Sequence, residues 1–217
     1  MTGFLILIIF LGFLPSLIWL LFYLRKDVHP EPKEMVIKIF LLGMLSAFVG
    51  AVLSLFFSGL IKNFQLSFYL ALFLQIFISV ALIEEIIKYL PVHFYVLNNP
   101  EFDEPIDAMI YMIISGLGFA AVENILFLSS TFFISQRIEA TIFTLLGRFI
   151  SATLLHALAS ANIGYFLALS FLKFKRKILF FSIGVLTSAL LHGIYNFAVK
   201  INEILPAGVT FSSLPCL

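Results

Sequence analysis

The sequence contains little charge and almost no cysteine. Only 12% of its 217 residues are Asp, Glu, Lys or Arg, about half the fraction of an ordinary soluble domain. Such a chain cannot cover a water-soluble surface, so we exclude a soluble enzyme, a nucleic-acid-binding protein and a disordered regulator. The single cysteine, Cys216, excludes a disulfide framework and a cysteine-based metal site. The formal net charge of +1 gives no indication of a polyanionic partner.

Long hydrophobic runs make up most of the chain. Hydrophobic residues account for 62% of it, 27 residues are Phe, and the mean hydropathy is +1.12. Because about 20 apolar residues span a bilayer, we predict an all-α, polytopic transmembrane helical bundle in a single domain, residues 1–217. The six predicted spans are residues 3–24, 35–61, 64–97, 108–133, a part of 138–174, and 178–199. A seventh span within residues 201–217 is left open, and Pro91 is expected to kink the overlong third span.

The distribution of Lys and Arg predicts the orientation, because cytoplasmic loops carry the excess of these residues. The first and fifth loops are rich in them and fall on the same side of a six-span protein, so both termini are expected to be extracytoplasmic. The first run has no positive stretch before it and no small-residue cleavage site after it, so we expect a retained span rather than a signal peptide. The basic residues of the two loops are Arg25, Lys26, Lys33 and Lys38, and Lys173, Lys175, Arg176 and Lys177.

A few ionisable residues remain inside the predicted spans. A charge at the centre of a membrane helix costs roughly 2.5–3.5 kcal/mol, whereas each Leu, Ile, Phe or Val contributes only about 0.3–0.6 kcal/mol in favour of insertion. Two Glu and one Lys cancel most of the favourable insertion free energy of the apolar residues in the third span. The polar face of this helix therefore requires contacts with other helices or with water. These intramembrane residues are Glu84, Glu85, Lys88, Glu123, Arg148, His156 and His192.

Four of these residues fall at one depth, although they come from four different spans. Counted from the predicted cytoplasmic ends, Glu84, Glu123, His156 and His192 lie about 13–16 residues inside, or roughly 20–24 Å at the helical rise. Asn196 follows His192 at a spacing of four and shares its helix face. Small residues flank each position and let membrane helices approach closely. We therefore expect the four helices to meet at their polar faces.

Carboxylates and imidazoles in a shielded cavity can activate water. Two His and one Glu would form a three-ligand zinc site with an open position for water, and another Glu could take the proton of that water. Without a metal, a desolvated Glu could serve as the base while Asn and His stabilise the oxyanion. The sequence has no Gly-x-Ser-x-Gly motif and no His-Glu-x-x-His motif.

Structural roles would also account for single residues. Glu84, Glu85 and Lys88 could form an ion pair near the interface, with Glu84 and Lys88 at a spacing of four. A protonated Glu123 could hydrogen-bond between helices, and Asn196 could join two helices. The matched depth of the two histidines and the carboxylates favours the functional interpretation.

The same residues resemble the ordered motifs of the PrsW intramembrane proteases, which share a superfamily with the CAAX prenyl proteases and the Abi proteins. The resemblance extends over roughly residues 83–196, more than half of the chain. The second motif ends in Glu, as in the PrsW branch, rather than in the His that is usual in the wider superfamily, which disfavours a prenylated substrate. The motifs are Glu84-Glu85-x-x-Lys88, Phe119-x-x-x-Glu123, His156 in a small-residue helix, and His192-x-x-x-Asn196.

The resemblance implies a glutamate-dependent membrane endopeptidase. Glu84 or Glu85 would activate water, and Asn196 would help to hold the oxyanion. Lys88 and Arg148 are predicted to support the site without reacting. The family has been described both as metal-dependent and as metal-free; for one divalent metal, zinc, the predicted ligands are Glu123, His156 and His192, which would also complete the catalytic site.

The predicted function is therefore cleavage of a membrane-tethered protein, with a catalytic core at about residues 64–200. The resemblance suggests an anti-sigma factor or a similar regulator as the substrate, and a bacterial-type cell membrane as the location. One alternative is a proton- or ion-coupled transporter, because Glu and His relays also mark ion paths, although no inverted repeat is present. The other is a non-catalytic scaffold or immunity-type protein that retains the motifs.

Overall fold

The computed structural model describes residues 2–172 and 176–204, so Cys216 and most of the C-terminal tail lie outside the described residues. Within the described ranges the regular structure is entirely helical. Six segments are long and apolar enough to cross a membrane, which confirms the predicted all-α polytopic bundle. The helices are α1 (Thr2–Leu24), α2 (Lys33–Asn63), α3 (Phe68–Phe73), the π-helix η1 (Leu74–Leu82), α4 (Ile83–Tyr95), α5 (Asp107–Ser135), α6 (Ile138–Ile150), α7 (Ala152–Leu172) and α8 (Lys177–Ile204).

Two of the predicted spans are subdivided. The third consists of α3, η1 and α4, and the π-helical hydrogen bonding of η1 returns to the α-helical pattern at Ile83, directly before the two glutamates. Pro91, where a kink is predicted, lies inside α4, which continues through this residue to Tyr95. The fifth span is divided at Ser151 into α6 and α7. A helix is the form a chain takes in lipid because all of its backbone groups are paired internally, so each interruption has to lie where protein contacts support it.

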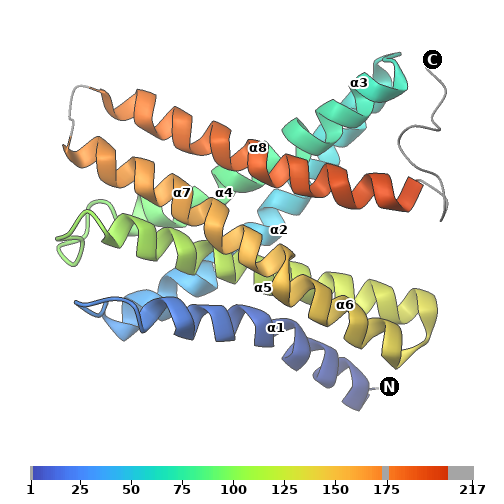
Figure 1. The fold of residues 1–217 in the computed structure, drawn as a ribbon, viewed down its shortest axis with the longest axis horizontal. Coiled ribbons are helices and arrows are strands. Elements are labelled where there is room, and N and C mark those ends of the chain that lie inside the picture. The colour runs from blue at the N-terminus through green and yellow to red at the C-terminus, as the bar shows by residue number, and fades with distance from the viewer. Residues whose placement is uncertain (1, 173–175, 205–217) are drawn as a thin grey trace.

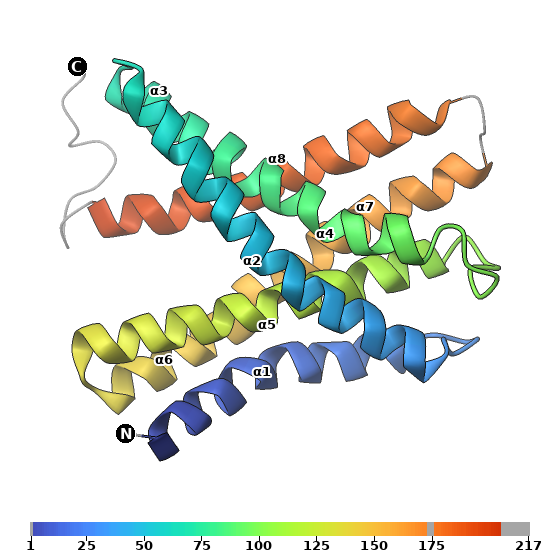
Figure 2. The same ribbon diagram turned by 180° about the vertical axis from the view of Figure 1, so that it is seen from behind.

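Helix α5 is the central element. In its most hydrophobic 18-residue stretch 72% of the residues are buried, compared with 22–33% in the other spans. Figures 1 and 2 show α1, α6 and α7 beside α5, α2 crossing it obliquely, and α8 on the far side of α7. Small residues permit these close crossings: a side chain at Gly118 would collide with the Phe40 carbonyl of α2, and one at Gly164 with the backbone of α5 at Ala108.

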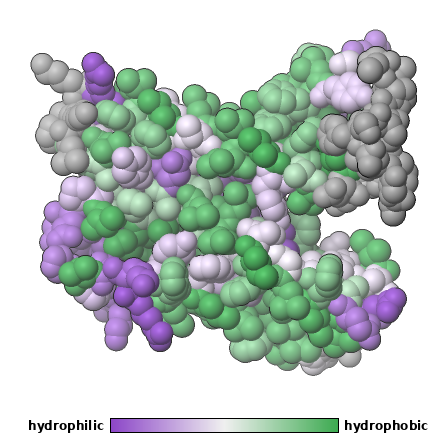
Figure 3. All heavy atoms as spheres, in the orientation of Figure 1, coloured by the Kyte–Doolittle hydropathy of each residue, from purple (hydrophilic) through white to green (hydrophobic). Residues whose placement is uncertain are grey.

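The ends of the bundle are polar and its sides are hydrophobic. The connections from α1 to α2 and from α4 to α5, the end of α7 and the start of α8 lie at one end, opposite the N-terminus (Figure 1). Hydrophilic residues gather at that end, and hydrophobic side chains cover most of the visible surface between the two ends (Figure 3). This distribution is that of a protein embedded in a bilayer.

A group of polar side chains joins the first and third loops at this end, and we call His29, Glu31, Glu104, Asp107 and Tyr111 the loop-end cluster. The Tyr111 hydroxyl donates to Glu31 Oε2 at 2.6 Å, and His29 Nδ1 lies 2.7 Å from Glu104 Oε1. The Asp107 carboxylate accepts from the backbone N–H of Glu104 at 2.9 Å. Partial burial raises the pKa of Glu31 to about 7, and the nearby Asp107 carboxylate adds to the increase.

Candidate active site

Six ionisable side chains from four helices meet in the middle of the bundle, and we call them the inner cluster. None of the six side chains is more than 21% exposed, and those of Glu85 and Lys88 are fully buried. The residues that share one predicted depth therefore also share one place in space. The cluster consists of Glu84, Glu85 and Lys88 from α4, Glu123 from α5, His156 from α7 and His192 from α8.

The Lys88 ammonium lies at the centre of this cluster. Its Nζ is 2.7 Å from Glu85 Oε1 and 2.7 Å from His156 Nδ1, and it lies over the Phe119 ring at 4.7 Å. Glu84 Oε2 is farther away, at 4.0 Å. The sequence analysis considered a Glu84–Lys88 pair near the interface, but the closer partner is Glu85, and Lys88 is turned inward among the helices.

The hydrogen bonds of His156 define its neutral tautomer. An ammonium group can only donate, so Nδ1 of His156 accepts from Lys88 and the ring hydrogen lies on Nε2. Nε2 then donates to Glu123 Oε2 at 2.8 Å. Both ring nitrogens of His156 are thus engaged, one with α4 and the other with α5.

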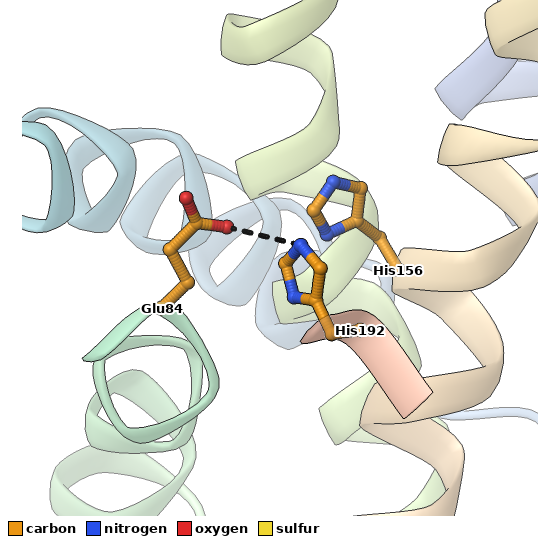
Figure 4. Close-up of side chains that lie close together, drawn as sticks. All are labelled: Glu84, His156 and His192. Atoms are coloured by element: carbon orange, nitrogen blue, oxygen red, sulfur yellow. Dashed lines mark ion pairs between the residues drawn. The ribbon is translucent and has the colours of Figure 1, made fainter. Parts of the chain in front are cut away.

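His192 has the opposite arrangement. Its Nδ1 lies 2.8 Å from Glu85 Oε1, so in the neutral ring Nδ1 carries the hydrogen and Nε2 carries the lone pair. Nε2 lies 3.7 Å from Glu84 Oε2, as Figure 4 shows, with the His156 ring beside it. The two imidazoles meet edge to face, with centroids 5.0 Å apart. Glu85 therefore orients His192 and leaves its second nitrogen directed at Glu84.

Arg148, near the end of α6, holds the outer carboxylate of the inner cluster. Its Nη2 donates to Glu123 Oε2 at 3.0 Å, and its Nε donates to Asn124 Oδ1 at 2.7 Å. The guanidinium also lies over the Phe127 ring at 4.1 Å. Asn124 is buried and in turn donates to Thr153 Oγ1 at 3.1 Å. The sequence analysis included Arg148 but missed Asn124, although a polar residue beside Glu123 in a small-residue helix was a usable signal.

A cavity of about 380 Å³ adjoins the inner cluster. Its polar lining includes Glu123, His156 and His192, and its wall toward η1 includes Gln75. In Figure 3 the surface is hollowed between α8 above and α5 and α6 below, at the end away from the basic loops. The predicted residue Asn196 lines the cavity.

Tyr195, which the sequence analysis did not single out, lines the same cavity beside Asn196. Its hydroxyl lies 2.9 Å from Ser151 Oγ, at the break between α6 and α7. The adjoining motif residues were the only available signal for it.

The donor set fits a divalent metal. Ligand atoms of Glu84, His156 and His192 lie within 4.8 Å of one another, and Glu84 Oε2 is buried with no hydrogen-bond partner among the described residues. One carboxylate and two imidazoles form a zinc-type ligand set. The predicted set has Glu123 in place of Glu84, and in the structure Arg148 and His156 hydrogen-bond to the Glu123 carboxylate.

The charges of the inner cluster also favour a cation. With both imidazoles neutral, its three carboxylates face only two cations, Lys88 and Arg148, so one negative charge is not balanced. A buried charge without a partner is costly. A bound metal ion or one proton would remove this excess.

These features define a class of protein. Carboxylates and imidazoles that converge beside a cavity in an all-helical membrane protein have the chemistry of a membrane hydrolase, because they can activate water by general-base or metal-assisted catalysis.

Comparison with known proteins gives the family. The sequence profile described as "PrsW family intramembrane metalloprotease" matches residues 31–216, so the chain belongs to the PrsW family and is a membrane protease. Protease PrsW of Oceanobacillus iheyensis is 32% identical over 191 residues, which cover 87% of this chain and 81% of the relative. Protease PrsW of Geobacillus kaustophilus is 30% identical over 186 residues, 84% and 74% of the two chains. The Bacillus subtilis protein of the same name is 28% identical over 183 residues, 81% and 74% of the two chains. No solved structure matches the chain significantly.

The comparison decides among the three functions that the sequence left open. A family of proteases favours the hydrolase over the transporter and the scaffold. The family is also described as one of metalloproteases, which agrees with a possible ligand set at Glu84, His156 and His192.

Proposed function

We propose that this protein is a zinc-dependent endopeptidase that cleaves a membrane-tethered regulatory protein, with the inner cluster as its active site. The observation that carries the proposal is the convergence of Glu84, Glu123, His156 and His192 beside one cavity, with Glu84 Oε2 lacking a partner among the described residues. The catalytic core extends over about residues 64–200, which contain every member of the cluster.

The carboxylates and histidines of the inner cluster have different roles in this proposal. Glu84, His156 and His192 would hold the metal, which supplies a Lewis acid and activates a bound water when present. Glu123 takes the proton of the attacking water, because its carboxylate is the most exposed of the three and lines the cavity. Glu85 is fully buried and holds His192 in the required tautomer, as a carboxylate behind a metal-binding histidine does.

The remaining polar residues orient the base and the substrate. Arg148, fixed by Asn124, directs the Glu123 carboxylate. Asn196 and Tyr195 line the cavity and offer hydrogen-bond donors to the oxygen of the scissile carbonyl, where negative charge develops.

An anti-sigma factor in a bacterial cell membrane is the substrate that we propose, on the family resemblance and because the cavity lies within an integral membrane protein. We also propose that the N-terminus is extracytoplasmic, because the basic first loop and the start of α8, which begins at Lys177, lie together at the opposite end (Figure 1). The cavity, lined by the last turns of α8, would then open toward the extracytoplasmic half.

The experiment compares membrane proteomes. Bacteria expressing the wild-type protein, Glu84→Gln or Glu123→Gln are analysed for new protein termini, with Glu104→Gln as the control because Glu104 is an exposed loop carboxylate. We expect fragments of a membrane-tethered protein, an anti-sigma factor in our proposal, with the wild type and the control only. Fragments that persist with Glu84→Gln and Glu123→Gln would contradict the proposed site. Wild-type fragments from other proteins only would contradict the substrate but not the site.

A further inference from the structure

The Lys88 ammonium contacts the His156 nitrogen that a metal would need as a ligand. Its Nζ lies 2.7 Å from His156 Nδ1, which is the ring nitrogen with the lone pair because Nε2 donates to Glu123 on α5. We propose that Lys88 is an internal cation that holds His156 in the metal-free protein and moves onto Glu85 when the metal binds. This inference rests on the proposed metal-dependent function.

The competition follows from the chemistry of the two partners. A metal coordinates the lone pair of an imidazole nitrogen, and an ammonium N–H binds to that same lone pair. His156 therefore cannot accept from Lys88 through Nδ1 and ligate a metal through Nδ1 at the same time. His192 has no such conflict, because Glu85 binds the N–H side of its ring and leaves Nε2 directed at Glu84.

The structure contains an acceptor for the released ammonium. Two carboxylate oxygens of the inner cluster, Glu84 Oε2 and Glu85 Oε2, are buried without a hydrogen-bond partner among the described residues. A metal bound with Glu84 satisfies the first, and Lys88 satisfies the second by moving along the carboxylate whose Oε1 it already contacts at 2.7 Å. Unpaired buried oxygens are costly, so one rearrangement would remove two penalties.

The backbone under Lys88 is fixed, so only the side chain has to move. Ser115 on α5 donates its hydroxyl hydrogen to the Lys88 carbonyl at 2.6 Å, which ties this turn of α4 to α5. A purely structural ion pair with Glu85 would not require the second contact with His156. That contact instead places a cation beside the ligand set and keeps the ring in the position the metal requires.

The test uses the full-length protein purified in detergent and compares Lys88→Met with Arg148→Met. Each variant removes one cation that contacts the carboxylates of the inner cluster, but only Lys88 contacts a candidate metal ligand. Zinc affinity is measured by competition with a chelator, and thermal stability is measured with and without zinc. Lys88→Gln serves as a second neutral variant if Lys88→Met does not fold.

For Lys88→Met we expect a lower melting temperature without zinc and a zinc affinity roughly 10- to 100-fold higher, because no charge-assisted hydrogen bond must be broken. For Arg148→Met we expect a zinc affinity within about threefold of the wild type. An equal increase in both variants would show a general charge effect, and a weaker affinity in Lys88→Met and Lys88→Gln would show that Lys88 helps to hold the metal; either result overturns the inference but leaves the proposed function intact. A wild-type protein that cleaves without binding zinc would overturn both.

Discussion

The inner cluster and the loop-end cluster are made of similar residues in different surroundings. Both combine carboxylates with histidine, and both join segments that lie far apart in the sequence. In the loop-end cluster the side chains of His29 and Glu104 are 72% and 40% exposed, whereas no side chain of the inner cluster exceeds 21%. Water can therefore reach the His29–Glu104 contact, whereas it can reach few contacts of the inner cluster. Burial, rather than residue type, therefore separates a site from a solvated loop.

The difference also appears in how the contacts are connected. The inner cluster forms a continuous series of contacts from Glu123 through His156, Lys88 and Glu85 to His192. Outside the cluster the series continues from Glu123 to Arg148, Asn124 and Thr153. Removing one member leaves a neighbour unpaired in a medium of low polarity, which is costly. The comparison predicts large effects for changes in the inner cluster and small ones at the loop end.

The largest effect is expected for Glu84→Gln. The change preserves shape but removes the carboxylate that two imidazoles surround, so we expect substrate cleavage to fall about 10²- to 10⁴-fold. Cleavage of the identified substrate in proteoliposomes measures it, and metal content measured on the same samples should fall as well. Glu104→Gln in the loop-end cluster should retain full activity; an equal loss in both variants would remove the distinction between the two groups.

Glu85→Gln tests stability more than chemistry. The substitution removes the closest anionic partner of the buried Lys88 ammonium, and breaking a buried ion pair costs about 3–5 kcal/mol. Denaturant unfolding in detergent should show this loss, and a Glu85→Gln/Lys88→Met double variant should recover part of it without recovering cleavage. If the single variant is as stable as the wild type, the Glu85–Lys88 pair does not support the fold.

Arg148→Met is expected to have an intermediate effect. It releases the Glu123 carboxylate without removing it, so cleavage should fall by about 10- to 100-fold, mainly in kcat rather than KM. Asn124→Leu should give a smaller decrease in the same direction, because Asn124 acts through Arg148. A change confined to KM would instead indicate that Arg148 binds the substrate directly.

The smallest effect is expected at the loop end, and it depends on pH. Because the pKa of Glu31 is about 7 in the folded protein and 4.5 in the reference state, the folded protein binds the extra proton between these values. Its contribution to stability is therefore complete below about pH 4.5 and is lost as the pH rises through about 7. Melting temperatures measured from about pH 5 to about pH 8 should decrease less in Glu31→Gln than in the wild type; identical profiles would show that Glu31 does not contribute.

The sequence predicted the helical bundle well because membrane spans have a simple sequence pattern. Long apolar runs and basic loops define spans from composition alone, and the structure places all six within a few residues of the expected bounds. The shared depth of Glu84, Glu123, His156 and His192 also anticipated their convergence, because depth follows from counting residues along a helix.

Which atoms meet could not be predicted in the same way. Glu84 and Glu85 are adjacent in the sequence, and only the rotation of α4 decides that Glu85 binds Lys88 and His192 while Glu84 lies near the open nitrogen. The contact of Asn124 with the site depends on Arg148, which lies at the end of α6, just before the break at Ser151. Such rotations and breaks arise from packing between helices, which a single sequence does not show.

The π-helix η1 has an evolutionary consequence. Its i→i+5 hydrogen bonds accommodate more residues per turn than an α-helix does, so residues 74–82 can gain or lose a residue while the helix continues. Gln75, Ile76 and Val80 of this segment line the cavity, whereas the two glutamates follow it in regular α4. Insertions and deletions in η1 would alter the wall that meets the substrate and leave Glu84 and Glu85 at their depth. Substrate choice could thus diverge among descendants of this protein while the chemistry is inherited unchanged.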